Sequence, residues 1–186
     1  MKIIAFSGRK QSGKSTAGEF LQKINKNVEI YAFADRLKKD ICINMLGMSH
    51  DQCYGSDDLK NTQTDIVWDN KKLTAREVME IVGTDIFRKL KKDVWVSSTI
   101  NLIKKEKPDV ACIVDVRFPD EVDAIHNIGG KVVRLTRDPF NSNNSIECAL
   151  DACNYDWKNF DFILDNSNID VNEKNKVLQD LSAYFF

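Results

Sequence analysis

Short apolar runs alternate with longer helical patterns along most of the chain. Five runs have the length and composition of buried strands, at residues 3–6, 28–33, 110–115, 131–136 and 161–165. Around them, apolar residues recur at spacings of three and four, which predicts helices over about 16–26, 34–46, 74–90, 95–107, 119–128 and 171–181. This alternation predicts an α/β fold, a doubly wound five-stranded parallel sheet with flanking helices.

Local signals mark where several of these elements begin and end. Thr74 and Glu77 are spaced as a capping box at the start of a helix. Gly47 ends the helix that precedes them, and the glycine pair at 129–130 ends a later one. Between residues 48 and 72 the pattern weakens into polar residues and turn signals, and we expect a mobile or inserted segment there.

Composition and charge are those of one globular domain. The chain has 186 residues, of which 42% are hydrophobic and 30% charged, and its formal net charge is -1. This near balance argues against a broad nucleic-acid surface, which normally carries a basic excess. The lysine pairs at 38–39, 71–72, 91–92 and 104–105 are interpreted as solvated helix faces and turns.

Cysteines, histidines and the N-terminal residues do not indicate a metal centre, secretion or a membrane span. The five cysteines include no CxxC pair, and His50 and His126 lie far apart in the sequence. The N-terminal apolar run is too short for a signal peptide, and no apolar stretch approaches the ~18 residues of a spanning helix. We therefore expect a cytoplasmic protein.

The clearest chemical signal is the sequence GRKQSGKS at residues 8–15, which has the form GxxxxGKS between a predicted strand and a predicted helix. Glycines let the backbone curl so that successive N–H groups and the helix N-terminus face one anion. Lys14 would then bind the β- and γ-phosphates of a nucleoside triphosphate, and the Ser15 hydroxyl would bind Mg²⁺. The alternative, a glycine turn that caps a helix, leaves the Lys14–Ser15 pair unexplained.

Two acidic residues follow predicted strands, at the sheet edge where α/β proteins bind ligands. Asp35 is equally compatible with a helix N-cap and with a substrate contact. For Asp115 we favour a role in the Mg²⁺ shell over a simple strand-end cap, because of the upstream glycine loop. Arg117, two residues further on, could hold a phosphate by a bidentate contact.

The remaining signals favour phosphoryl transfer to a small anionic acceptor. The chain lacks the DxxG and NKxD motifs of GTPases. It has four arginines near predicted loop edges, Arg36, Arg88, Arg117 and Arg137, and a stretch rich in Asn and Ser at 140–145 that we interpret as a flap. Positioning and charge neutralisation by such groups supply most of the catalysis in phosphoryl transfer.

Together these segments resemble the deoxynucleoside monophosphate kinases of bacteriophages, in the P-loop nucleotide kinase superfamily. The resemblance covers nearly the whole chain in order, and the GTD and DVRFPDE segments are its most particular parts. The matching residues are GRKQSGKST at 8–16, FADRLK at 33–38, TARE through GTD and Arg88 at 74–88, DVWV at 93–96, DVRFPDE at 115–121, and Glu147 with Ala149 and Leu150.

The resemblance implies a single P-loop kinase domain over 1–186, with an acceptor-binding helical region at about 35–107 and a lid at about 137–153. It implies ATP and Mg²⁺ as cofactors and a deoxynucleoside monophosphate as substrate, with no nucleic acid and no membrane. It is compatible with a homodimer, and with the host cytoplasm if a phage encodes the chain.

Roles follow from the resemblance residue by residue. Arg117 and Arg137 would bridge the transferred group when the flap closes, and no general base is needed because the acceptor is already an oxyanion. Trp95 could stack on a base or lie in the core, and Arg76 could reach the acceptor or only support the capping box. The implied ATP-binding residues are Gly8, Lys10, Ser12, Gly13, Lys14, Ser15 and Thr16; the metal ligands are Ser15 and Asp115; the substrate-binding residues are Asp35, Arg36, Lys38, Arg76, Arg88, Trp95 and Glu147; and the catalytic residues are Lys14, Arg88, Arg117 and Arg137.

One departure and three alternatives accompany this interpretation. The family often has His-x-Ser/Thr-Glu in the flap, where this chain reads Asn-Ser-Ile-Glu at 144–147. A kinase of the same fold acting on phosphomevalonate or dephospho-coenzyme A is the nearest alternative. A polynucleotide kinase would need a basic track that the charge balance does not provide. A nucleotide-binding regulatory module without turnover is the third, and the intact Lys14, Ser15, Asp115 and Arg117 argue against it.

Overall fold

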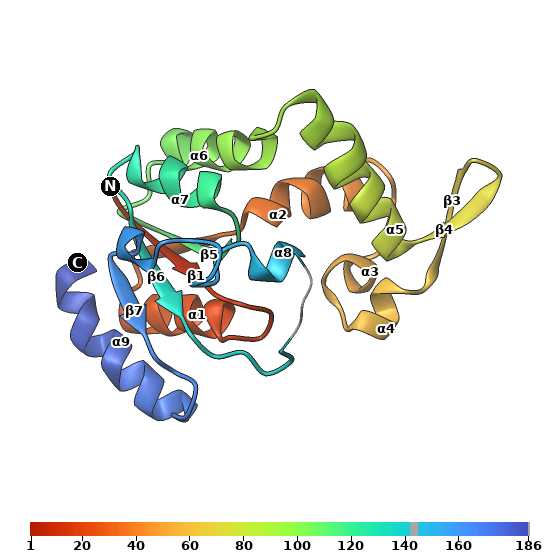
Figure 1. The fold of residues 1–186 in the computed structure, drawn as a ribbon. Helices are drawn as coiled ribbons and strands as arrows, with labels where there is room; N and C mark the ends of the chain where they lie inside the picture. Colours follow the sequence, from red (N-terminus) through yellow and green to blue (C-terminus); the bar gives the residue numbers. More distant parts are fainter. Residues whose placement is uncertain (142–144, 186) are drawn as a thin grey trace. The chain divides into compact units, whose positions relative to one another are not determined.

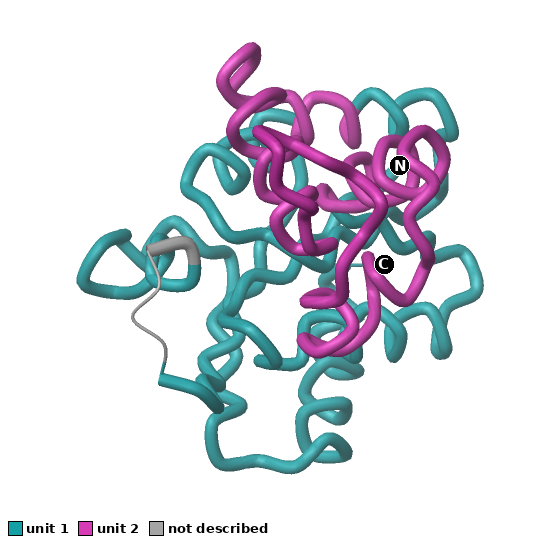
Figure 2. Tube along the Cα trace, turned by 90° about the vertical axis from the view of Figure 1, so that its right-hand side faces the viewer, with its two compact units in different colours: residues 1–32, 101–186 teal, residues 33–100 magenta. Residues whose placement is uncertain are grey.

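The computed structural model describes residues 1–141 and 145–185. These residues form two compact units, one of residues 1–32 and 101–186 and the other of residues 33–100 (Figure 2). We call them unit 1 and unit 2. The predicted acceptor-binding region at 35–107 overlaps unit 2 almost completely, and the predicted lid at 137–153 belongs to unit 1, although its residues 142–144 lie outside the described part.

Unit 1 is built on a five-stranded sheet in the order β2-β5-β1-β6-β7, in which all neighbouring strands pair in parallel. Apolar runs form these strands because the inner ones are covered on both faces. The parallel sheet predicted from the sequence is therefore confirmed. The strands are β1 (Lys2–Ser7), β2 (Val28–Tyr31), β5 (Val110–Val116), β6 (Lys131–Leu135) and β7 (Phe162–Leu164).

Helices cover both faces of this sheet. In Figure 1, α1 (Lys14–Ile24) and α9 (Val171–Phe185) lie on one face and α7 (Pro119–His126) on the other. At Gly18, a Cβ atom would lie 2.6 Å from Val114 Cγ1, so glycine allows α1 to pack closely on β5. Unit 1 also contains two short helices, α8 (Ser145–Cys148) and η3 (Trp157–Asn159). The long helix α6 (Val94–Glu106) begins in unit 2 and ends in unit 1.

Two π-helical segments dominate unit 2. The first, η1 (Arg36–Ile43), continues α2 (Phe33–Asp35), and the second, η2 (Ile81–Arg88), continues α5 (Ala75–Glu80). The predicted capping box opens α5, because the Thr74 hydroxyl accepts from Glu77 N at 3.3 Å and the Glu77 carboxylate accepts from Thr74 N at 2.8 Å. A separate apolar cluster holds the unit together, with Cys42, Met48, Cys53, Leu73, Ala75 and Val78 at its centre.

The segment 48–72 has regular structure that the sequence pattern did not predict. It contains α3 (His50–Tyr54), α4 (Asp57–Lys60) and the hairpin of β3 (Gln63–Trp68) with β4 (Lys71–Thr74). Ser49 and Ser56 cap the two helices. Elements of four to six residues are too short to show a clear period, so turn signals dominated the prediction.

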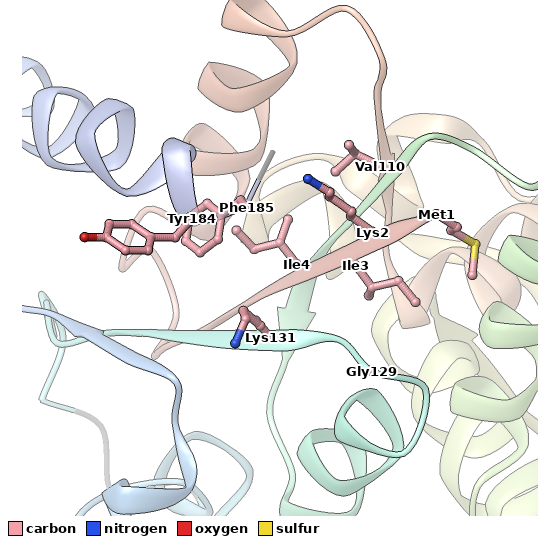
Figure 3. Close-up of a pocket in the computed structure, with 9 residues that line it drawn as sticks. All are labelled: Met1, Lys2, Ile3, Ile4, Val110, Gly129, Lys131, Tyr184 and Phe185. Carbon is pink, nitrogen blue, oxygen red and sulfur yellow. The ribbon is translucent and has the colours of Figure 1, made fainter.

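A cavity of about 240 Å³ opens at the amino ends of β1 and β6 (Figure 3). Tyr184 and Phe185 of α9 line it together with Lys2 and Lys131. Residues 8–15 follow the carboxyl end of β1, so this cavity lies at the other end of the strand from the glycine loop. No helix in the described ranges 1–141 and 145–185 is long and apolar enough to cross a membrane.

Candidate active site

The glycine loop connects β1 to α1 and turns on its two glycines. Gly13 has φ +99°, a left-handed conformation that side chains rarely adopt. A Cβ atom at Gly8 would collide with the Ser12 hydroxyl, which packs against it. Helix α1 begins at Lys14, so its positive end faces the loop. The loop backbone therefore has the curled conformation that the sequence predicted, with the N-terminus of α1 beside it.

Lys14 is buried within this loop. Its ammonium donates to the carbonyl oxygens of Gly8 at 2.8 Å and Arg9 at 2.7 Å. Burial, followed by the nearby charge of Arg117, lowers the pKa of Lys14 to about 8. The cation is thus held by neutral carbonyl groups in a poorly solvated place, where an anionic ligand would be attracted strongly.

Three further predicted residues gather around Lys14. Asp115 near the end of β5, Arg117 after it and Glu147 on α8 all act on its pKa electrostatically, the two carboxylates raising it. Glu147 accepts a hydrogen bond from the backbone N–H of Lys10 at 2.5 Å and forms an ion pair with Arg117. The structure therefore brings Lys14, Asp115, Arg117 and Glu147 together. Glu147 was predicted to bind the acceptor, and here it contacts the glycine loop of unit 1.

The turn before α7 fixes the backbone of Arg117. The carboxylate of Glu121 is buried and accepts from Arg117 N at 2.6 Å and Phe118 N at 3.1 Å. Glu121 is the third residue of α7, so the DVRFPDE segment carries its own helix cap.

A set of ion pairs that the sequence did not predict anchors the loop to later parts of the chain. Arg9 pairs with Asp138 at 2.9 Å and with Asp151, and Arg134 of β6 pairs with Asp151 at 3.0 Å. Arg9 is one of the unspecified positions of GxxxxGKS, and its partners lie more than 125 residues away. No local signal in the sequence marks this arrangement.

A second cavity, of about 140 Å³, adjoins the loop on the side of α9. The Asn166 amide donates to Ser12 O at 2.8 Å and accepts from the backbone N–H of Arg137 at 3.0 Å. Lys174 of α9 donates to the Thr16 hydroxyl at 2.6 Å. The sequence prediction missed Asn166 and Lys174. Asn166 lies just beyond β7, at the same sheet edge as Asp115, so the strand-end rule could have found it.

The donor atoms near the loop suit Mg²⁺. Ser15 is exposed at the start of α1, and the Asp115 carboxylate is half-buried at the end of β5. Within the described residues, no cluster of three or more His, Cys, Asp or Glu side chains could hold a metal ion. Mg²⁺ commonly takes one or two protein oxygens and completes its shell with water and phosphate, so this hard-oxygen pair fits it.

In unit 2, the residues predicted to face the acceptor lie around the start of η1. Asp35 accepts from the Tyr54 hydroxyl at 2.7 Å and pairs with Lys39 at 2.8 Å, and it makes no capping hydrogen bond to the backbone. Lys38 lies over the ring of Tyr54, 4.6 Å from its centroid. Arg36 forms an ion pair with Asp40, while its Nε is buried and has no hydrogen-bond partner within the described chain.

The other unit 2 candidates lie on α5, η2 and α6. Arg76 donates to Asn61 at 3.0 Å and pairs with Asp57 at 2.9 Å, so it ties α5 to α4. Arg88 is half-buried at the end of η2. Trp95 is buried; its indole N–H donates to Gly83 O at 3.1 Å, and its ring packs on Phe87. Trp95 thus takes the core position that the sequence left open beside base stacking.

A protein-family model described as deoxynucleotide monophosphate kinase matches residues 43–168. The chain belongs to this family. A protein of Acanthamoeba polyphaga mimivirus, provisionally classed as a deoxynucleotide monophosphate kinase, is 30% identical over 179 residues, which cover 90% of this chain and 89% of the relative. The deoxynucleoside-5'-monophosphate kinase of Escherichia phage T5 is 40% identical over 50 residues, 26% of this chain and 20% of that one.

Two solved kinases share the fold of this deoxynucleotide monophosphate kinase family member. Shikimate kinase from Acinetobacter baumannii aligns with a TM-score of 0.57 and 12% identity, over 99% of this chain and 94% of that one. Dephospho-CoA kinase from Campylobacter jejuni aligns with a TM-score of 0.57 and 14% identity, over 99% and 97%. The P-loop kinase fold predicted from the sequence is confirmed.

Proposed function

We propose that the chain transfers the γ-phosphoryl group of ATP to a deoxynucleoside monophosphate, giving ADP and the deoxynucleoside diphosphate. The observation that carries this proposal is the buried Lys14 in a glycine loop, in a chain that belongs to the deoxynucleotide monophosphate kinase family. Loop, lysine and helix N-terminus are the parts that hold nucleotide phosphates in P-loop enzymes.

The donor side of the reaction is assigned to unit 1. The N–H groups of residues 8–16, with Lys14, bind the ATP phosphates, and the ammonium exchanges its carbonyl partners for phosphate oxygens. The cavity beside Asn166 and Arg137 is open to the same loop and receives the nucleoside. Ser15 and Asp115 hold Mg²⁺, which neutralises part of the phosphate charge when bound.

Arg117 and the backbone N–H of Lys10 are assigned to the transferred group. Glu147 occupies one loop N–H, that of Lys10, and one face of the Arg117 guanidinium. A phosphate oxygen has the same charge and acceptor chemistry as this carboxylate, so the γ-phosphoryl group takes its place at both donors. Arg137 supplies a further cation near the loop for the transferred group.

The acceptor side is assigned to unit 2. Arg36 and Arg88 bind the monophosphate, and the buried Arg36 Nε without a hydrogen-bond partner among the described residues supports this role. Asp35, Lys38 and Arg76 shape the rest of the site, Asp35 and Lys38 through their contacts with Tyr54. A general base is not required, because a phosphate oxyanion attacks directly.

The decisive experiment measures ADP formation from ATP and Mg²⁺ with dTMP, dGMP, dCMP, dAMP and the corresponding ribonucleotides, beside phosphomevalonate and dephospho-coenzyme A. We expect turnover that depends on a deoxynucleotide, and the panel then defines which bases and sugars are accepted. Turnover with only the other acceptors would reassign the chain to a sister kinase. ATP binding without turnover on any acceptor would support a regulatory module.

A further inference from the structure

The two π-helical segments of unit 2 approach each other most closely at one glycine. Gly83 is buried in η2, and a Cβ atom placed on it would lie 2.6 Å from Cδ2 of Leu37 in η1. Only a residue without a side chain fits this gap while Leu37 keeps its position. The Leu37 side chain itself packs against the apolar cluster of unit 2, so a shift away from Gly83 disturbs that packing.

A second contact fixes the backbone at the same point. The indole N–H of Trp95 donates to the carbonyl oxygen of Gly83 at 3.1 Å, and the Trp95 ring packs on Phe87 in η2, with centroids 5.3 Å apart. The contact with Leu37 and the hydrogen bond from Trp95 therefore meet at Gly83, and together they hold η2 in its position against η1.

These segments carry the residues assigned to the acceptor phosphate. Arg36 and Lys38 flank Leu37 in η1, and Arg88 is the last residue of η2. π-Helical turns are rare and occur frequently at functional sites, where they redirect side chains. A change in the spacing of η1 and η2 thus changes the distance between the two arginines.

We propose that Gly83 is a positioning residue for the acceptor site. Its contact with Leu37 and its hydrogen bond to Trp95 set the spacing of η1 and η2 at which Arg36 and Arg88 bind one monophosphate. The inference rests on the proposed function, because it concerns the acceptor half of that site. It assigns the acceptor affinity to a residue that does not itself touch the substrate.

The test compares steady-state constants of Gly83→Ala with those of the wild-type protein. We expect the KM for the preferred deoxynucleotide to rise about fivefold or more, since a methyl group forced into a packed contact displaces its neighbours. The KM for ATP is expected to stay within about twofold, because the donor residues lie in unit 1.

A double variant separates positioning from general damage. In Gly83→Ala/Leu37→Ala the smaller side chain makes room for the new methyl group, and the KM for the deoxynucleotide is expected to return toward the wild-type value. Val78→Ala is the matched control, because Val78 is buried in the same cluster on α5. It should lower the melting temperature without raising that KM.

The remaining outcomes are decisive. A folded Gly83→Ala protein with a wild-type KM, or a double variant that fails to recover, would overturn the inference. If Gly83→Ala does not fold, Trp95→Phe replaces it, since it keeps a ring but removes the N–H; an unchanged KM there would equally overturn it. Wild-type protein without deoxynucleotide-dependent turnover would instead refute the proposed function, and this inference with it.

Discussion

At the scale of single residues, Lys14 holds the centre of the candidate site. Its buried ammonium donates to the neutral carbonyl groups of Gly8 and Arg9, and the carboxylates of Asp115 and Glu147 act on it electrostatically. A cation placed in this way serves an incoming polyphosphate better than it serves the fold, because burial costs it solvation that neutral carbonyls replace only in part.

Replacement of Lys14 by alanine should therefore affect turnover far more than stability. For Lys14→Ala we expect phosphoryl transfer to fall by about 10²-fold or more, the usual cost of removing one preorganised donor. The melting temperature should change little, because the variant loses two hydrogen bonds but no longer buries a charge. Lys23→Ala, an exposed position on the same helix, is the control. A well-folded Lys14→Ala protein with normal activity would exclude the proposed site.

The lowered pKa of Lys14 predicts that ATP binding is accompanied by proton uptake. Burial lowers the pKa of Lys14 to about 8, from 10.5 for an ordinary lysine, and bound phosphates should raise it. At about pH 9 ATP binding should take up a proton, so ATP affinity should fall as the pH rises above about 8. Lys14 is also expected to contribute stability that increases from about pH 8 to 10.5, because the unfolded chain binds more protons in this window.

Calorimetry with a non-hydrolysable ATP analogue can measure this proton. Titrations at about pH 7 and about pH 9, in buffers of different ionisation enthalpy, give the number of protons taken up. Lys14→Met should remove the uptake. Equal affinity at both pH values, with no proton uptake in the wild-type protein, would contradict the assignment.

At the scale of elements, the turn from β5 to α7 both starts a helix and positions Arg117. Glu121 caps α7 and at the same time accepts the backbone N–H of Arg117. The position of Arg117, whose guanidinium pairs with Glu147, therefore depends on Glu121, the third residue of α7. The Glu121 side chain therefore contributes both to the stability of α7 and to the position of Arg117.

Glu121→Ala should show both consequences. We expect unfolding free energy to fall by about 1–2 kcal/mol, the typical cost of losing a cap, and kcat to fall as Arg117 loses its backbone anchor. Urea unfolding and steady-state kinetics measure the two effects. Asp120→Ala, in the first turn of the same helix, controls for the loss of a negative charge near its N-terminus. Loss of stability with an unchanged kcat would show that Arg117 does not depend on the cap.

The strands and long helices of unit 1 were predictable, whereas the elements of unit 2 were predictable only in part. All five strands of the parallel sheet lie within two residues of their predicted bounds, because each is a short, largely apolar run bounded by polar or turn-forming residues. The elements of 48–72 were missed because each is too short to show a period. The π-helical form of η1 and η2 was also missed, since an apolar helical spacing does not distinguish it from an α-helix.

The candidate site likewise has a part that the sequence predicted and a part that it did not. The loop residues 8–15 and the Thr74–Glu77 cap were predicted because the signals are local. The pairing of Arg9 with Asp138 and Asp151, and of Asn166 with Ser12, joins residues far apart in the sequence. Such contacts arise only when strands from distant segments meet at one sheet edge, so no single segment reveals them.

At the scale of the whole molecule, the two units separate the predicted donor and acceptor residues. All residues assigned to ATP and Mg²⁺ belong to unit 1, and all those that we assign to the acceptor side belong to unit 2. Each unit also has its own apolar cluster. A ligand that binds one half of the site should therefore stabilise mainly the unit that holds it.

Hydrogen–deuterium exchange can test this separation directly. A non-hydrolysable ATP analogue alone should slow exchange in residues 8–20 and around Asn166, whereas a deoxynucleoside monophosphate alone should slow it in η1 and η2. The Gly83→Ala variant is the control, because it should weaken only the second effect. Protection of the 8–15 loop by the monophosphate alone would show that the acceptor binds where we assign the donor. Because the exchange data assign protection to segments of the sequence, that outcome would also remove Arg36 and Arg88 from the acceptor site. Arg117 and Glu147 would then be the first residues to test for acceptor binding.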